Sequence, residues 1–432
     1  MNGSTLLLAA IAAGVGVIGI LLFRASPRLT FVVWALVLFF VPVWIGVNVG
    51  FFWSAITLLT LVAVLTNISD IRLNGIDLIM GVFTLMAATQ FALKMTGLSA
   101  TVIALLEWVL PYIWGRLVLS RVKRSFVTAV LATVVTVAAV LGLIEFATGT
   151  NIFVSLPAMG ADLYASWGGL QVRADRLRVE GAWGHSIAMG AAFAMSSAFI
   201  VAARWPVAVR LVALGIVTAA TVTTISRIGM LTLAFTVVLS VLLLPGLDRA
   251  MRWSVAALGV VAAIIIIPFV GEIFLEAGDE AGGSADYRSG LFSLVSQVQL
   301  FGSAGDWSGL TVGGEYLGAY AKSVDNAFLV FALRFGWIPS LLLIAALVFA
   351  AAYILRPGKA SPPSIAVASQ LPAIFAVALI TQAGAYLWFL AGLAVAWAQQ
   401  GRDADAADDQ AALPSLFSMS RTKEDSVFAS RR

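Results

Sequence analysis

The dominant pattern along the chain is a series of apolar runs separated by polar connections. Most runs are long enough for one transmembrane helix, which needs about 20 apolar residues to cross the hydrocarbon core of a bilayer. The pattern predicts an all-α polytopic membrane protein with twelve or thirteen transmembrane helices. The runs lie near 4–23, 29–47, 50–66, 76–94, 100–119, 125–147, 183–203, 207–225, 227–245, 252–271, 326–354 and 364–399.

The count depends on two regions. The run 364–399 is long enough to cross twice with a break near Gln382, which gives 13 spans, an external N-terminus and a cytoplasmic C-terminus. A different interpretation of the weaker region 29–66 gives 12. The first run has no basic residues before it and is long enough to span, so we expect a retained helix rather than a cleaved signal peptide.

Basic residues occur in alternate connections, which the positive-inside rule assigns to the cytoplasm. The two longer segments, about 148–182 and 272–325, then lie on the outer face of the cytoplasmic membrane. Residues 401–432 have little apolar periodicity and predict a disordered cytoplasmic tail after a transmembrane domain over 1–400. The basic connections contain Arg24 and Arg28; Arg72; Arg116, Arg121, Lys123 and Arg124; Arg204 and Arg210; Arg249 and Arg252; Arg356 and Lys359.

Composition narrows the chemistry. The chain is 61% hydrophobic and 11% charged, against a charged fraction of about 25% in soluble domains. The absence of cysteine excludes disulfides, cysteine-ligated metals and thiol catalysis, and a single histidine, His185, argues against a multi-histidine metal site. A net charge of +4 is too small to indicate nucleic-acid binding. The sequence has no Walker loop and no nucleophile-elbow motif, and we expect neither a metal nor a cofactor.

Arginines in the first outer loop depart from the positive-inside pattern. Arg173 and Arg176 lie close to acidic residues, so a solvated loop explains them as well as a binding role does. Arg178 directly precedes a glycine-containing helix start, and free N–H groups at such a start can bind an anion. We therefore favour a functional role for Arg178.

The next outer turn reads Thr223-Thr-Ile-Ser-Arg-Ile-Gly229 and joins two spans with almost no loop. Arg227 is either an arginine that extends to the interface or a fixed cation that faces an internal cavity, and we favour the cavity. Ser226 either caps the following helix or binds a ligand oxygen.

The second outer loop contains acidic and glycine-rich stretches and then Asp286-Tyr287-Arg288. Apolar residues at helical spacing between Ser289 and Leu300 predict a helix on the membrane surface. The loop ends in Asp325-Asn326, immediately before an apolar run. This pair either caps the helix or has a chemical role, and the two roles are compatible.

At these positions the sequence resembles the O-antigen ligase and polysaccharide polymerase family of bacterial membrane glycosyltransferases. The resemblance covers roughly residues 70 to 400. It rests on the order of several short motifs around one large outer loop rather than on any single motif. These motifs are Arg178-Val-Glu-Gly-Ala-Trp-Gly-His185-Ser-Ile-Ala-Met-Gly190, Thr224-Ile-Ser-Arg-Ile-Gly229, Tyr287-Arg288 with Gly302 and Gly305, and Val324-Asp-Asn-Ala-Phe-Leu329 with Gly336.

The resemblance implies transfer of a glycan from a polyprenyl-diphosphate carrier to an acceptor hydroxyl, in a glycan or glycolipid, at the outer face of the membrane. It implies that Arg178, Arg227 and Arg288 hold the diphosphate without a metal. Members that act as ligases usually have His-Asn or His-Ser where this chain has Asp325-Asn326. The difference favours a polymerase of exopolysaccharide, capsule or O-antigen repeat units over a ligase, with other polysaccharide-assembly proteins as further partners.

The residues fit this chemistry and leave alternatives open. Departure of a diphosphate needs fixed positive charge, and the attacking hydroxyl needs a proton acceptor. Asp325 is the first candidate base and His185 the second, with Asn326 and Ser226 in supporting roles. A lipid-linked glycan transporter would use the same cations, but it needs polar groups along its whole path, whereas mid-span acids such as Glu107 and Glu145 are few. A membrane scaffold would leave the outer arginines unexplained.

Overall fold

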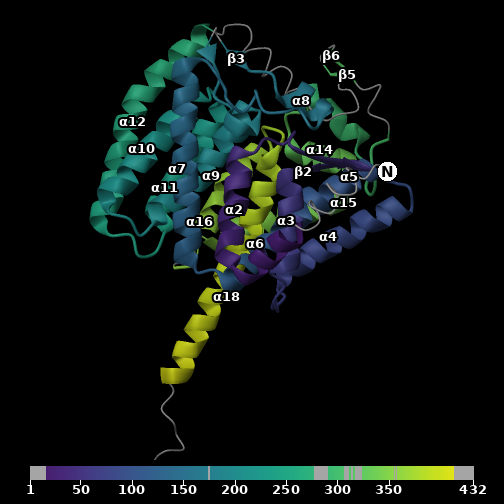
Figure 1. Cartoon of the computed structure of the whole chain (residues 1–432), viewed down its shortest axis with the longest axis horizontal. Helices are drawn as coiled ribbons and strands as arrows, with labels where there is room; N and C mark the ends of the chain where they lie inside the picture. Colours follow the sequence, from purple (N-terminus) through teal and green to yellow (C-terminus); the bar gives the residue numbers. More distant parts are fainter. Residues whose placement is uncertain are drawn as a thin grey trace, which may run out of the picture.

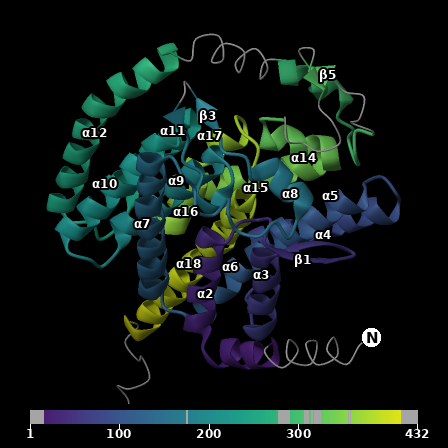
Figure 2. The ribbon, with the colours of Figure 1, turned by 45° about the horizontal axis from the view of Figure 1, so that its top comes forward.

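The computed structural model shows a mostly helical chain whose helices pack around a central helix near the C-terminus (Figure 1). It describes residues 16–173, 176–276, 290–305, 311–312, 315–316, 324–354, 356 and 358–412. Figure 1 shows α8 and β3 toward one end of the molecule and the C-terminal half of α18 at the other, and Figure 2 again shows β3 on the side opposite the end of α18.

The helices that build this body differ widely in length. In chain order they are Gly16–Ala25, α2 (Pro27–Phe40), α3 (Ala55–Thr66), α4 (Gly75–Ala92), α5 (Leu98–Ile103), the π-helix η1 (Ala104–Val109), α6 (Leu110–Arg121), α7 (Arg124–Thr148), α8 (Ala161–Trp167), the 3-10 helix η2 (Gly181–Trp183), α9 (Ser186–Ala202), α10 (Val207–Thr223), α11 (Arg227–Leu243), α12 (Arg249–Glu276), the 3-10 helix η3 (Leu291–Gln297), α14 (Ala327–Phe335), α15 (Trp337–Ile354), α16 (Pro362–Ser369), α17 (Leu371–Ile374) and α18 (Gln382–Ala412).

Within the described residues, four helices are long and apolar enough to cross a membrane. They are Gly75–Ala92, Leu98–Arg121, Arg124–Thr148 and Arg249–Pro268. A bent pair, Gly16–Ala25 and α2, would be a fifth, with a bend of 118° between its two helices. Five further apolar helices have 10–17 residues. The mostly helical, membrane-type fold agrees with the sequence, whereas the count of 12 or 13 spans stays a prediction.

The all-α prediction agrees with a mostly helical chain, and the described residues also form three short antiparallel hairpins. They are β1 (Gly46–Val49) with β2 (Phe51–Ser54), β3 (Val172–Arg173) with β4 (Arg176–Leu177), and β5 (Thr311–Val312) with β6 (Glu315–Tyr316). The first hairpin occupies the end of the predicted run 29–47 and the start of the predicted run 50–66. Helix α2 stops before Pro42, which cannot continue a helix, and the chain reverses at Gly50, whose φ is 73°.

The predicted span 326–354 is broken into α14 and α15 at Gly336, where φ is 84°. The chain before α14 runs past this break, and the Gly302 N–H donates to the Phe335 carbonyl over 3.1 Å. In place of the predicted surface α-helix, the shorter 3-10 helix η3 buries Leu291 and Leu294 against α14. A loop that fills the break satisfies backbone groups that an unbroken helix would have paired internally.

The predicted span 364–399 is also divided, and only its second part is long. Helices α16 and α17 have 8 and 4 residues, and α18 begins at Gln382, at the predicted break. Helix α18 continues to Ala412, so the first part of the predicted disordered tail is helical. Residues 413–432 lie outside the described residues.

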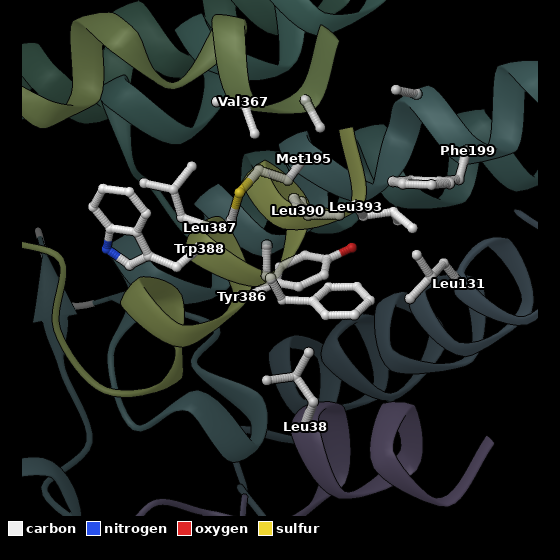
Figure 3. Close-up of a cluster of buried hydrophobic side chains, with 14 of the residues drawn as sticks. Leu38, Leu131, Met195, Phe199, Val367, Tyr386, Leu387, Trp388, Leu390 and Leu393 are labelled. Carbon is white, nitrogen blue, oxygen red and sulfur yellow. The ribbon is translucent and has the colours of Figure 1, made fainter. Parts of the chain in front are cut away.

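Helix α18 forms the centre of the apolar core. Tyr386, Trp388 and Leu390 belong to one buried apolar cluster that also contains Phe199 of α9 and Leu131 of α7 (Figure 3). The Tyr386 hydroxyl pairs with the Ser196 hydroxyl at 2.8 Å, so the polar atom of this buried aromatic has a partner.

Helices α6 and α18 approach each other closely through two glycines. A Cβ atom on Gly115 would lie 2.1 Å from the Phe389 carbonyl oxygen, and one on Gly392 would lie 2.0 Å from the Tyr112 carbonyl oxygen. Small residues allow such backbone contact between membrane helices. The contact sets the position of the central helix relative to α6.

We expect Gly392→Ala to destabilise the protein by about 1–3 kcal/mol, because the added methyl group forces two backbones apart. Gly401→Ala is the matched control, since a Cβ there meets no atom within 4 Å in the same helix. Melting temperatures of the two purified variants test this packing. Equal melting temperatures would contradict it.

Candidate functional site

The first predicted outer loop forms an ordered structure over one end of the helices. Glu145, near the end of α7, accepts hydrogen bonds from the backbone N–H groups of Glu180 and Gly181, each at 3.0 Å. The Asn151 side chain donates to the same carboxylate over 3.0 Å. Glu145 is 4% exposed. This buried carboxylate fixes the segment that follows Arg178, a role that the sequence did not predict.

The loop brings Arg178 to the turn that precedes Arg227. The Arg178 Nε donates to the Thr224 carbonyl over 3.1 Å, and the Val179 N–H donates to the Thr223 carbonyl over 3.1 Å. Arg178 is 7% exposed. Two segments about 50 residues apart in the sequence are therefore joined here, and part of the Arg178 guanidinium holds the turn in place.

The turn itself is strained. Ile225 has a φ of 49°, a left-handed conformation that is rare for a β-branched residue. The Arg173 side chain also donates to the Ile225 carbonyl, over 3.4 Å. Such strain persists only where surrounding contacts impose it, and it is often found at functional sites.

Arg227 is exposed at the first position of α11. Ser226 caps this helix, because its Oγ accepts the Gly229 N–H over 3.1 Å. The sequence left open whether Ser226 caps the helix or binds a ligand oxygen, and in the structure it caps the helix. Gly190 of α9 and Gly229 pack against each other, and a Cβ on Gly229 would lie 3.1 Å from the Gly190 Cα. This contact fixes the start of α11 against α9.

Glu180 is fully buried beside Arg178. Its Oε1 accepts the Gln171 N–H over 2.8 Å, and its Oε2 has no hydrogen-bond partner among the described residues. Burial raises the pKa of Glu180 to about 8, against the opposing effects of that hydrogen bond and of Arg178. Glu180 is therefore mostly protonated at neutral pH, so only a minor fraction is available there as a base.

His185 is the N-cap of α9. Its Nδ1 accepts the Ile187 N–H over 3.1 Å, so the neutral ring carries its proton on Nε2. Burial lowers the pKa of His185 to about 3, and the charge of Arg178 adds to the effect. The ring is therefore suited to donate a hydrogen bond to a ligand oxygen rather than to accept a proton.

The pKa values of Glu180 and His185 predict a characteristic pH dependence of stability. Burial raises the pKa of Glu180 above its unfolded value, so its stabilising contribution is lost as pH rises toward 8. The depressed pKa of His185 affects the stability of the protein only below about pH 6.5. We expect the melting temperature to fall between pH 6.5 and pH 8.5, and Glu180→Gln to reduce this fall. An unchanged slope in the variant would contradict the assignment.

Asp325 and Asn326 have different positions at the start of α14. The Asn326 Oδ1 accepts the Leu329 N–H over 2.9 Å, so Asn326 is the N-cap. Asp325 is half-buried immediately before it. The structure thus gives the capping role, which the sequence left open for the pair, to Asn326.

A cavity of about 420 Å³ lies beside this helix start. Glu107 in the π-helix η1 and Arg334 in α14 both line it, and their charges attract each other. Trp167 also lines the cavity and packs edge-on against His185, with ring centroids 5.8 Å apart. The cavity therefore shares a wall with the Arg178 loop. Its other lining residues include Asp162, Ser166, Ala327, Phe331 and Thr381.

Two features of the cavity are typical of functional sites. A π-helical turn inside a longer helix is frequent at such sites. Thr381 has a φ of 50°, and its buried hydroxyl has no hydrogen-bond partner among the described residues. Sequence reasoning missed Arg334 and Thr381. An arginine inside the apolar run 326–354 was the available signal for Arg334.

The structure therefore brings Arg178 together with the turn that carries Ser226 and Arg227, and His185 contacts a wall of the cavity near the start of α14. Arg288 lies outside the described residues.

Comparisons with protein-family models, with curated proteins and with solved structures find no match for this chain.

Proposed function

We propose that the chain is a membrane glycosyltransferase that polymerises polyprenyl-diphosphate-linked oligosaccharide units at the outer face of the cytoplasmic membrane. The observation that carries the proposal is the joining of Arg178 to the turn of Arg227. Guanidinium groups stay charged and bind phosphate oxygens through paired hydrogen bonds. Arg227 is exposed at this turn, where a diphosphate can reach it.

In the proposed reaction the acceptor hydroxyl oxygen attacks C1 of the carrier-linked sugar. The bond between C1 and the diphosphate oxygen breaks, and the polyprenyl diphosphate leaves with the electron pair. Arg227 and Arg178 stabilise the negative charge that develops on it, together with Arg288. The hydroxyl proton passes to the Asp325 carboxylate. Glu180 is the weaker candidate base because its pKa of about 8 keeps it protonated at neutral pH.

The aromatic residues in and next to the cavity favour an enzyme over a transporter. Trp108 and Phe331 line the cavity, and their ring centroids are 4.1 Å apart. Trp388 packs against both, at 6.5 Å and 6.4 Å. A diphosphate that crossed the membrane through this region would have to pass a desolvating aromatic layer, at a high energetic cost.

The test is turnover of a defined substrate. Purified protein is incubated with a polyprenyl-diphosphate oligosaccharide in the presence of EDTA, and the products are separated by size. A ladder of lengthened glycans is expected, because the proposed arginine clamp replaces a metal. Transfer of single units to a lipid acceptor would indicate a ligase. Activity that EDTA removes and magnesium restores would contradict the arginine clamp.

A further inference from the structure

A second cavity, of about 510 Å³, lies between α4, α6, α15, α16 and α18. Its mouth is formed by Asn74 at the start of α4, by Arg356 and Lys359 after α15, and by Ala398 of α18. Three of these residues belong to or adjoin connections that the sequence predicts to be cytoplasmic. The cavity is therefore distinct from the arginine site, which lies in the predicted outer loops.

The cavity has the depth of one membrane leaflet. Along α18 it extends from Ala398 at the mouth to Trp388 at the base, ten residues away, or about 15 Å at 1.5 Å per helical residue. The hydrocarbon core of a bilayer is about 30 Å thick. The walls below the mouth are mainly apolar and include Met80, Leu347 and Val395. One acyl chain of a lipid fits a cavity of this depth with these apolar walls.

The cavity also faces the surrounding lipid. Phe349 and Ala350 of α15 line it. The Phe349 side chain is 62% exposed at the surface of the helix bundle. A lipid molecule can therefore enter sideways from the bilayer and does not need to pass through the protein.

The charge at the mouth selects for an anion. Among the described residues, those that line the cavity include Arg356 and Lys359 but no aspartate or glutamate. The neighbouring acid, Asp77, is paired with Arg116, whose Nε lies 2.8 Å from the Asp77 Oδ1. The hydroxyl of Tyr112, another lining residue, also donates to Asp77 over 2.7 Å. Asp77 is thus neutralised and does not repel an anionic headgroup.

We propose that this cavity binds one anionic phospholipid from the adjacent leaflet, with its phosphate at Arg356 and Lys359 and an acyl chain along α18 down to Trp388. Basic pockets between membrane helices commonly bind anionic headgroups. Ser361 and Ser364 also line the cavity, but their hydroxyl groups are engaged in the cap of α16, so the phosphate contacts are assigned to the two basic side chains. The binding is independent of the proposed glycan transfer.

The test compares two lipids with identical acyl chains, phosphatidylglycerol and phosphatidylcholine. The purified full chain in detergent is titrated with each, and bound lipid is counted by native mass spectrometry. We expect an approximately 30-fold preference for phosphatidylglycerol, which corresponds to two basic side chains at about 1 kcal/mol each. The double variant Arg356→Gln/Lys359→Gln should lose most of this preference and keep its melting temperature, because both residues are exposed.

Arg204→Gln is the matched control, because Arg204 is exposed in another connection with the same predicted orientation and does not line the cavity. It should keep the preference. A second variant, Ala391→Leu, narrows the apolar part of the cavity and should weaken binding of both lipids equally. Equal affinity of the unaltered protein for the two lipids would overturn the proposal. So would a preference that survives the double variant or is lost equally in Arg204→Gln.

Discussion

Asp325→Asn is expected to lower glycan transfer by roughly 10²–10⁴-fold, the effect of removing a general base. The amide has nearly the shape of the carboxylate but cannot accept a proton at neutral pH. Protein stability should be maintained, because the capping bond of α14 comes from Asn326 and not from Asp325. Initial rates of chain extension and melting temperatures, measured on the same preparation, separate the two effects.

Asp70→Asn is the control for loss of a carboxylate, since Asp70 is exposed in a predicted cytoplasmic connection. It should leave both measurements unchanged. Asn326→Ala should instead affect stability. It removes the cap of α14, and we expect it to lower the free energy of unfolding by about 0.5–2 kcal/mol. Near-normal transfer by Asp325→Asn would exclude Asp325 as the base. Glu180 would then be examined at pH values above its pKa of about 8.

Arg227→Lys is expected to reduce transfer roughly 10²-fold, the typical effect of removing one fixed donor from a developing charge. Lysine keeps the positive charge but loses the planar pair of donors that fits two phosphate oxygens. Abundance and melting temperature should change little, because Arg227 is exposed and the cap of its helix is Ser226. Transfer rates at saturating donor, with protein quantified in the membrane, give the measurement.

The conservative change also tests the competing role of Arg227. An arginine that merely extends to the membrane interface can be replaced by lysine, which does the same. Full activity of Arg227→Lys would therefore identify such an interfacial residue and remove Arg227 from the clamp. Arg204→Lys, at an exposed position in a predicted cytoplasmic connection, should be neutral in either case.

The helix boundaries show how far a local pattern can be used. Long uniform runs such as 125–147 were placed well, since α7 spans Arg124–Thr148. The run 326–354 was predicted as one span, yet it breaks at Gly336, where a loop from elsewhere in the chain pairs with the backbone. The residues on both sides of this break are mostly apolar. Hydropathy therefore could not reveal it.

The candidate site was found in part. The departure of Arg178 and Arg227 from the charge pattern of their surroundings singled them out, because charge near apolar segments is costly. The sequence could not separate the roles of Asp325 and Asn326, since either residue can cap a helix. It also gave no reason to place Glu107 near Arg334, since the two lie more than 200 residues apart in the chain and only the folded structure brings both to the same cavity.

The sequence by itself determined the class of fold and the segments that carry unusual charge, because both follow from the free energy of transferring residues between water and lipid, which is set locally. The tertiary structure decided the rest. It buried Glu145 under the first outer loop, attached Arg178 to the Thr224 carbonyl, and made the His185 Nδ1 the acceptor that caps α9. These features depend on contacts between distant segments and on the loss of water around buried groups, which only the folded chain brings about.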